Sequence, residues 1–526
     1  MTLASRAIGR SFKLPPAATR AVAVDRDVDV RMRDGVVLKT NHYAPRLDSA
    51  PTVMIRSPYG RNGIIGVATG RVLAERGFHV VLQSCRGTFG SGGDFQPMRH
   101  ERTDGLDTIA WIQEQPWFDG NLFTYGPSYV GFTQWAVADS PAIKGMLLAV
   151  TASSFRDPTY AGGSFSLDTV LNWAGLIGDQ GGSLLSFAVR QARTRRRLRG
   201  AWNHLPLSEV DVVATRREVQ FVREWLANAD DEAYWLDRGH AALIGSITAP
   251  ICMVGGWYDI FLPWQLADYD RLRAAGAQPR LVIGAWTHAS TDLLAQSIRE
   301  GIDWFREQLS GESTEKPVKL YVGGANEWRT YDEWPPAART QEWFLGPDRT
   351  LSTIPTAAAG SDHFRYDPAD PTPSPGGPLL TQEAGRVDNA GVETRADMLV
   401  YTSDVLSDDV EAIGPVTADI HLRTSSPHFD VFVRICDVAP NGRSENVCDG
   451  LTRIDDGAET VRVELWPTAY RWRAGHRIRV QVAGAAHPRY ARNTGTGEPL
   501  GKATTLQSVD YEIALGASTI NLPVPI

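Results

Sequence analysis

One serine of this sequence stands at a predicted strand-to-helix turn, where it could act as a nucleophile. Ser128 follows the strand-like run 121–125 and precedes a helix-like run. In a nucleophile elbow such a turn exposes the serine oxygen, and the next backbone N–H, here that of Tyr129, faces a developing oxyanion. Gly126 stands in its usual place, but Gly131 comes one residue later than in G-x-S-x-G. The motif alone therefore leaves open an ordinary serine in a strand-to-helix turn.

Two further polar residues follow predicted buried strands. Asp259 comes after the strand 250–254, and His288 comes after the strand 279–284. We expect both at the same edge of the sheet as Ser128, in the chain order Ser, Asp, His that α/β-hydrolases use. The three residues together predict a serine nucleophile with a histidine base and an aspartate orienter. The alternative is that Asp259 only caps a helix and that His288 is a loop residue.

The surrounding pattern predicts an α/β domain with an insertion. Short apolar strands alternate with helices over 25–150 and 248–316, which indicates a mostly parallel sheet covered on both faces. Residues 151–247 carry mainly helical patterns, so we expect a helical cap over the carboxyl ends of the strands. Its predicted helices cover 166–177, the basic run 190–199, and 208–225.

The two ends of the chain have different patterns. Residues 1–24 are basic and lack the apolar run of a secretory signal, so we expect an arm that is disordered or draped on the surface. Over 317–526, runs such as 416–423 and 477–482 alternate apolar and polar residues, which predicts a β-sandwich. The Pro- and Gly-rich stretch 367–377 is expected to be a long surface loop of this module.

Composition narrows the classes of function. With 526 residues, of which 43% are hydrophobic and 22% charged, the chain has the composition of a globular protein with two or three domains. A net charge of -8 gives no basic surface for nucleic acid, and no segment suits a membrane. The composition leaves open whether the chain forms a homodimer. Cys85, Cys252, Cys436 and Cys448 lack metal-ligand spacing and are typical of thiols in a reducing, cytoplasmic compartment. We therefore expect no metal and no organic cofactor.

Several motifs together resemble one family. They are Arg56-Ser57-Pro58-Tyr59, Cys85-Arg86-Gly87 before Ser91-Gly92-Gly93-Asp94-Phe95, Trp117-x-Asp119-Gly120, the Ser128 motif, Gly255-x-Trp257-x-Asp259, Trp286-Thr287-His288 and His487-Pro488-Arg489-Tyr490. The set is similar to the cocaine-esterase-like hydrolases related to X-prolyl dipeptidyl peptidases, over nearly everything after about Val28. This resemblance implies an α/β-hydrolase fold with an inserted helical cap and a C-terminal β jelly-roll domain. Ser84 stands where the family commonly has an acidic residue, which leaves a buried ion pair with Arg86 open.

The resemblance also implies a role for each site residue. Ser128 would attack an acyl carbon to form an acyl-enzyme, His288 would take its proton, and Asp259 would orient the imidazole. The hydroxyl of Tyr59 and the backbone N–H of Tyr129 would be the two donors of the oxyanion hole.

The substrate is the least determined feature. We expect a small-molecule carboxylic ester whose acyl group contacts aromatic side chains, namely Trp173, Trp257, Phe261 and Trp286. One alternative is an amide-cleaving relative, such as a β-lactam acylase, an alpha-amino acid ester hydrolase or an X-prolyl aminopeptidase-like enzyme. This alternative needs cap carboxylates for a substrate ammonium, and the candidates are Asp157, Asp168 and Asp179. A less favoured alternative is a non-catalytic binding protein on the same scaffold.

Overall fold

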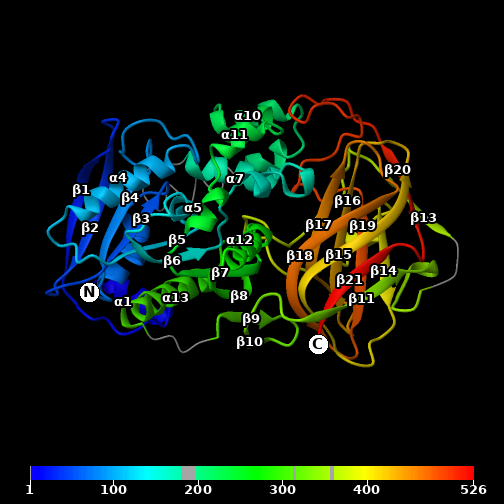
Figure 1. The fold of residues 1–526 in the computed structure, drawn as a ribbon. Coiled ribbons are helices and arrows are strands. Elements are labelled where there is room, and N and C mark those ends of the chain that lie inside the picture. The colour runs from blue at the N-terminus through cyan, green and yellow to red at the C-terminus, as the bar shows by residue number, and fades with distance from the viewer. Residues whose placement is uncertain (1, 179–192, 194–195, 312–315, 356–359) are drawn as a thin grey trace.

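The computed structural model describes the chain except for residues 1, 179–192, 194–195, 312–315 and 356–359. Figure 1 shows an α/β part beside an all-β part, with the cap helices over one end of the α/β sheet and next to the β strands. Within the described ranges, no helix is long and apolar enough to cross a membrane. The four cysteines are free and buried.

The α/β part is built on a ten-stranded sheet. Across the sheet its strands are β1 (Val22–Arg31), β2 (Val37–Pro45), β4 (His79–Ser84), β3 (Thr52–Ser57), β5 (Leu122–Pro127), β6 (Ile143–Ala149), β7 (Ile251–Tyr258), β8 (Arg280–Thr287), β9 (Val318–Val322) and β10 (Glu327–Tyr331). Neighbours from β4 to β9 are parallel, whereas β1, β2 and β10 pair antiparallel. The predicted mostly parallel sheet is confirmed.

Successive residues of the central strands face two separate cores. In β3, Met54 packs in one core with Tyr269, whereas Val53 and Ile55 pack in the other with Ile298. This alternation requires helices on both faces. The covering helices are α2 (Gly63–Ile65), the π-helical turn Gly66–Arg71, α3 (Val72–Ala74), α4 (Glu101–Gln113), α5 (Tyr129–Trp135), α12 (Leu262–Ala274) and α13 (Thr291–Ser310), with α1 (Leu3–Ser11) at the N-terminus.

Of the two states expected for the N-terminal arm, disordered or draped on the surface, the structure has the second for residues 3–11. Residues 3–11 form α1, whose first turn is closed by reciprocal hydrogen bonds between Thr2 and Ser5. Ser5 is buried, and its hydroxyl donates to Glu75 Oε1 at 2.8 Å. The arm is therefore a folded helix on the surface of the α/β part, held by this hydrogen bond and by the apolar contacts of Ile8 and Phe12 with the core.

The cap is helical, as predicted, and lies between β6 and β7. Its helices are α6 (Arg156–Thr159), α7 (Leu167–Ile177), α9 (Val210–Thr215), α10 (Gln220–Ala227) and α11 (Glu232–Leu236), with 3-10 turns at Ala161–Gly163, Leu207–Glu209 and Ala241–Ser246. The predicted helix over 208–225 is interrupted, because Arg216 has φ +67° and Asp211 accepts from the Val219 amide at 2.7 Å. The basic run predicted as helix over 190–199 is helical at residues 196–199, whereas residues 190–192 and 194–195 lie outside the described residues.

The C-terminal part is all β, as predicted. Its strands are β11 (Ala338–Leu345), β12 (Thr350–Ser352), β13 (Ser361–Tyr366), β14 (Met398–Ser403), β15 (Val410–Thr424), β16 (Phe429–Val438), β17 (Ser444–Ile454), β18 (Thr460–Trp472), β19 (Arg477–Ala483), β20 (Val509–Ala514) and β21 (Thr519–Pro525), with 3-10 turns at Pro347–Arg349 and Val392–Thr394. The jelly-roll connectivity stays a prediction.

One detail of the predicted C-terminal part needs correction. The boundary at residue 317 stays a prediction; β9 pairs in parallel with β8 and brings β10 into the first sheet. The stretch 367–377 is a loop, but it is not confined to the surface. Thr372 and Ser374 are buried, and the Thr372 hydroxyl donates to Asp397 at 2.7 Å. The loop therefore packs against the β strands and leads directly toward the cap.

Candidate active site

Ser128 occupies a strained turn between β5 and α5. Its backbone has φ 58° and ψ −130°, a region that residues with a side chain rarely adopt. Three hydrogen bonds hold it there, because the Ser128 amide donates to the Ala149 carbonyl at 3.0 Å and its carbonyl accepts from the amides of Gly131 and Phe132. The predicted elbow geometry is present, with the serine side chain facing a cavity.

The two glycines of the motif are needed for close packing around the elbow. A Cβ on Gly126 would lie 2.2 Å from Val130 Cγ1, and a Cβ on Gly131 would lie 2.5 Å from Thr151 Cγ2. The first turn of α5 therefore lies directly on β5 and on the chain after β6. This packing explains why the second glycine stands three residues after Ser128, since the position two residues after it is filled by Val130.

Asp259 and His288 form a hydrogen-bonded pair at the carboxyl ends of β7 and β8. Asp259 Oδ2 lies 2.5 Å from His288 Nδ1, and Oδ1 accepts from the Phe261 amide at 2.8 Å. The Asp259 carboxylate is fully buried, whereas the His288 side chain is 10% exposed. A carboxylate at Nδ1 keeps the proton on that nitrogen, so Nε2 carries the lone pair. The pair can thus accept a proton from a hydroxyl in the cavity that both His288 and Ser128 line.

The two predicted oxyanion donors belong to residues near Ser128: Tyr59 lines the same cavity, and Tyr129 follows Ser128 in the chain. Tyr59 follows β3 by two residues, and its hydroxyl oxygen accepts from Trp173 Nε1 at 3.1 Å. Burial raises the pKa of Tyr59 to about 12, although its hydrogen bonds with Trp173 and Ser128 act in the opposite direction. The phenol thus keeps its proton for donation. Tyr129 is the first residue of α5, and an amide in the first turn has no acceptor within its own helix.

The Tyr129 side chain is anchored by residues that the sequence did not reveal. Its hydroxyl accepts from the Met98 amide at 2.6 Å and donates to Glu101 Oε1 at 2.9 Å. Glu101 pairs in turn with the buried Arg56, at 3.1 Å. From the sequence, only the motif that contains Arg56 indicated this chain of contacts. The contacts fix the side chain of Tyr129, the residue whose backbone amide is the predicted oxyanion donor.

Arg86 does have a buried ion-pair partner, Asp104, although Ser84 replaces the acidic residue of the family pattern. Its guanidinium binds Asp104 of α4 at 2.6 Å and Asp34 of the β1–β2 turn at 2.7 Å. The Ser84 hydroxyl accepts instead from Arg61 Nη1 at 2.9 Å. The ion pair left open by the sequence is therefore formed with carboxylates from elsewhere in the chain.

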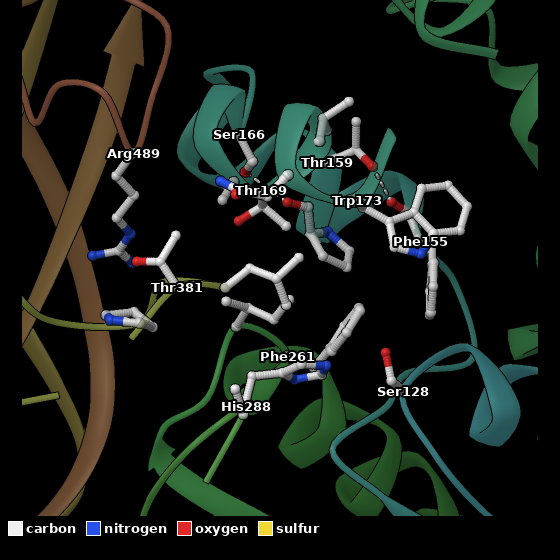
Figure 2. Close-up of a pocket in the computed structure, with 18 of the residues that line it drawn as sticks. Ser128, Phe155, Thr159, Ser166, Thr169, Trp173, Phe261, His288, Thr381 and Arg489 are labelled. Carbon is white, nitrogen blue, oxygen red and sulfur yellow. Dashed lines mark hydrogen bonds between the residues drawn. The ribbon is translucent and has the colours of Figure 1, made fainter. Parts of the chain in front are cut away.

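Ser128 and His288 open into a cavity of about 480 Å³ between the α/β part, the cap and the β domain. Figure 2 shows the hydroxyl of Ser128 and the ring of His288 at one wall of this cavity, with Phe261 beside His288 and Arg489 at the other end. Phe261 and Trp173, both predicted to contact substrate, line it. The His288 and Phe261 ring centroids are 5.6 Å apart. The volume is that of a pocket for a small organic molecule.

Two of the four predicted pocket residues do not line this cavity. Trp257 packs in the core, where its indole donates to the Tyr321 carbonyl at 2.7 Å and lies 5.8 Å from the ring of Trp334. Trp286 packs over Gly284 and lies 5.6 Å from Trp328. Both belong to β7 and β8, which extend further than predicted, so their side chains leave the strands away from the cavity.

Other lining residues were not predicted from the sequence. They include Ser166, Thr169 and Asn172 of the cap, Pro378, Leu380, Thr381 and Gln382 just after the long loop, and Trp466, Arg489 and Tyr490 of the β domain. For Arg489 and Tyr490 the motif His487-Pro488-Arg489-Tyr490 was a usable signal. The long loop offered none, because its composition indicates only the absence of regular structure. Among the described residues, no group of three or more His, Cys, Asp or Glu is placed to hold a metal ion.

Comparison with known proteins places this site in a family. Residues 34–290 match the model of the X-Pro dipeptidyl-peptidase (S15 family), and residues 311–519 match the model of the X-Pro dipeptidyl-peptidase C-terminal non-catalytic domain. The chain is 31% identical to cocaine esterase of Rhodococcus sp. (strain MB1 Bresler), over 90% of this chain and 93% of that protein. The chain belongs to the cocaine-esterase-like and X-Pro dipeptidyl-peptidase family of α/β-hydrolases. It is a serine hydrolase.

Solved structures of similar fold agree with this placement. An aminopeptidase from the marine sediment archaeon Thaumarchaeota archaeon superposes with a TM-score of 0.82 at 21% identity, covering 97% of this chain and 98% of that one. An alpha-amino acid ester hydrolase superposes with a TM-score of 0.81 at 20% identity, with the same coverage. These likenesses show the shared α/β-hydrolase fold with its C-terminal all-β domain.

Proposed function

We propose that this family member hydrolyses small carboxylic esters through an acyl-enzyme on Ser128. In this reaction His288 takes the serine proton and returns it to the leaving alcohol, while Asp259 holds the ring and stabilises its charged form. Tyr59 and the Tyr129 amide donate to the carbonyl oxygen as it becomes an oxyanion. Water then attacks the acyl-enzyme with His288 acting again as the base.

One observation carries this proposal. The 2.5 Å contact between Asp259 Oδ2 and His288 Nδ1 lies at the wall of the cavity that Ser128 lines, and Asp259 is fully buried. A buried carboxylate is stable only when its oxygens accept hydrogen bonds, and one oxygen of Asp259 already accepts from the Phe261 amide. The other oxygen fixes the orientation of the His288 ring at the cavity wall, as a general base requires. The same arrangement argues against a non-catalytic binding protein.

The charge of the cavity favours esters without an ammonium group. Within the described residues, its lining contains one arginine, Arg489, and no Asp or Glu. Arg489 pairs with Asp449, which also accepts two hydrogen bonds from Arg434, so this cluster retains a positive charge. A substrate ammonium would lose its hydration here and meet no carboxylate.

The cap carboxylates do not supply the missing negative charge. Asp157 is 45% exposed and pairs with Arg156. Asp168 is buried, outside the cavity lining, and burial raises its pKa to about 7. Asp179 lies outside the described residues. The amide-cleaving alternative with an α-amino substrate is therefore the less favoured of the two.

The buried thiols also support the proposal of a reducing, cytoplasmic compartment.

Labelling with a small fluorophosphonate tests the nucleophile. Peptide mapping should find one adduct, on Ser128, in the wild type and in the control variant Ser154→Ala. Ser154 lies at the start of the cap and does not line the cavity. Ser128→Ala should lose both the adduct and the turnover of p-nitrophenyl acetate. Ester turnover by folded Ser128→Ala would refute the proposal.

A matched pair of esters tests the substrate class. The p-nitrophenyl esters of 3-phenylpropanoic acid and of its α-amino derivative differ only in an ammonium group. We expect kcat/KM for the uncharged ester to be higher by about tenfold or more, because the ammonium is desolvated without a partner. A preference for the amino ester would support the aminopeptidase-like alternative instead.

A further inference from the structure

Trp173 of the cap contacts both residues that supply the predicted oxyanion donors. Its Nε1 lies 3.1 Å from the Tyr59 hydroxyl oxygen, although the two residues are 114 positions apart and belong to different parts of the fold. Its ring stacks on that of Tyr129, with centroids 5.7 Å apart and planes at 21°. Figure 2 shows the indole above Ser128 and next to Phe155. A residue of the inserted cap thus contacts one predicted donor group, the Tyr59 hydroxyl, and the side chain of the residue that supplies the other.

The orientation of the indole is held by other rings. Trp225 lies nearly parallel to it, at 5.9 Å and 6°, and Phe221 and Phe95 contact it at 5.0 Å and 6.4 Å. Aromatic neighbours in offset or edge-on contact restrict both side-chain torsions of a tryptophan. The N–H therefore has a fixed direction, set by the seating of α7 and α10 on the α/β part.

The chemistry of the contact determines where the Tyr59 hydrogen can point. An indole N–H only donates, so the phenol oxygen must be the acceptor. The hydroxyl hydrogen is then directed away from the indole, and Ser128, which lines the same cavity as Tyr59, is among the other polar neighbours of the phenol. A hydroxyl that accepts one hydrogen bond also becomes a stronger donor in the next.

We propose that Trp173 is a positioning residue of the oxyanion hole: its N–H fixes the Tyr59 hydroxyl toward the developing oxyanion and makes oxyanion stabilisation depend on the seating of the cap. This inference rests on the proposed acyl-enzyme mechanism. It goes beyond the role of Trp173 as a wall of the substrate cavity, since a wall acts on bulky acyl groups, whereas an oxyanion donor acts on every ester. Both acylation and deacylation pass through an oxyanion, so both steps depend on it.

The test is a double-mutant cycle between Trp173→Phe and Tyr59→Phe. Trp173→Phe keeps an aromatic ring and removes the N–H. The substrate is p-nitrophenyl acetate, whose acetyl group is too small to need the cavity wall, and the readouts are kcat/KM for acylation and the single-turnover rate of deacylation. We expect Trp173→Phe to lower both by about five- to tenfold, as for one neutral hydrogen bond, and to have no further effect in the Tyr59→Phe background.

Two additional variants keep the test decisive. Incorporation of 3-benzothienylalanine at position 173 replaces the N–H by sulfur without changing the ring shape, so it should reproduce the loss even if Trp173→Phe folds poorly. Trp225→Phe removes a neighbouring indole N–H of the same aromatic cluster, and its effect should be equal in the Tyr59 and Tyr59→Phe backgrounds.

The outcomes separate this inference from the proposed function. An equal loss from Trp173→Phe with and without the Tyr59 hydroxyl, or no loss at all, would overturn the positioning role. An unchanged rate in Tyr59→Phe, with Ser128 still labelled by the fluorophosphonate, would overturn it while leaving the nucleophile in place. Absence of the Ser128 adduct would instead remove the proposed function on which it rests.

Discussion

Replacing Asp259 by asparagine should remove most of the activity while preserving the fold. Both carboxylate oxygens accept hydrogen bonds, Oδ1 from the Phe261 amide at 2.8 Å and Oδ2 from His288 Nδ1 at 2.5 Å. An asparagine has one oxygen and one NH₂ group, so it cannot accept from both donors. If its oxygen stays with Phe261, the NH₂ faces His288 and forces Nδ1 to accept. The imidazole proton then moves to Nε2, the nitrogen that must take the serine proton.

The magnitude follows from this wrong tautomer. The comparable substitution in a serine protease triad lowers kcat by about 10⁴, which corresponds to about 5 kcal/mol of transition-state stabilisation. We expect a loss of the same order here, because Asp259 is fully buried and water cannot replace the lost acceptor.

The assay is kcat with p-nitrophenyl acetate at pH 7.5, together with a thermal melt. Asp268→Asn is the matched control. Asp268 is equally buried and accepts from the amide and hydroxyl of Ser153, but it lies outside the cavity lining. It should lower the Tm and leave the kcat of the folded protein near that of the wild type. If folded Asp259→Asn retained more than a tenth of the wild-type kcat, the assignment of Asp259 as the orienter would be refuted.

Three further predictions test the elbow, the cap and the cavity. Gly131→Ala places a Cβ 2.5 Å from Thr151 and should lower the free energy of unfolding by about 1–3 kcal/mol. Gly245→Ala is the control, because a Cβ there has nothing within 4 Å, and it should cost far less. Similar denaturation midpoints for the two variants would contradict the packing argument. The pKa of Asp168 is raised from 3.8 to about 7 by burial, so the folded protein binds the extra proton and stability falls by up to about 4 kcal/mol as the pH rises from about 4 to 7. Asp168→Asn should therefore raise the Tm more at pH 8 than at pH 5, and an equal shift at both pH values would speak against it. Phe261→Ala should lower the ratio of kcat/KM for benzoyl esters to that for acetyl esters by about tenfold, because Phe261 lines the cavity. Trp257→Phe should leave this ratio unchanged. The reverse pattern would show that Trp257, and not Phe261, contacts the acyl group.

The proposed catalytic residues could be located from the sequence because each follows a buried strand. Apolar runs and turn residues are local signals, and they located β5, β7 and β8 with Ser128, Asp259 and His288 at their ends. Parallel strands bring their carboxyl ends to one edge of a sheet, so the order along the chain was enough to predict a shared site. The family motifs added Tyr59, a role that residue type and spacing alone do not give.

Side-chain direction and long-range packing were decided only by the tertiary structure. Trp257 and Trp286 stand as near to the triad in sequence as Phe261 does, but the longer β7 and β8 turn them away from the cavity. The far wall comes from the segment around Thr381 and from Arg489, which follow Ser128 by more than 250 residues. Thr381 shows no local pattern of a site, and only a family motif indicated Arg489. The contact between Trp173 and Tyr59 depends on how the cap sits on the sheet. Local periodicity encodes which residues form the helices and strands. Which side chains line a cavity between three parts of a chain depends on how those parts pack.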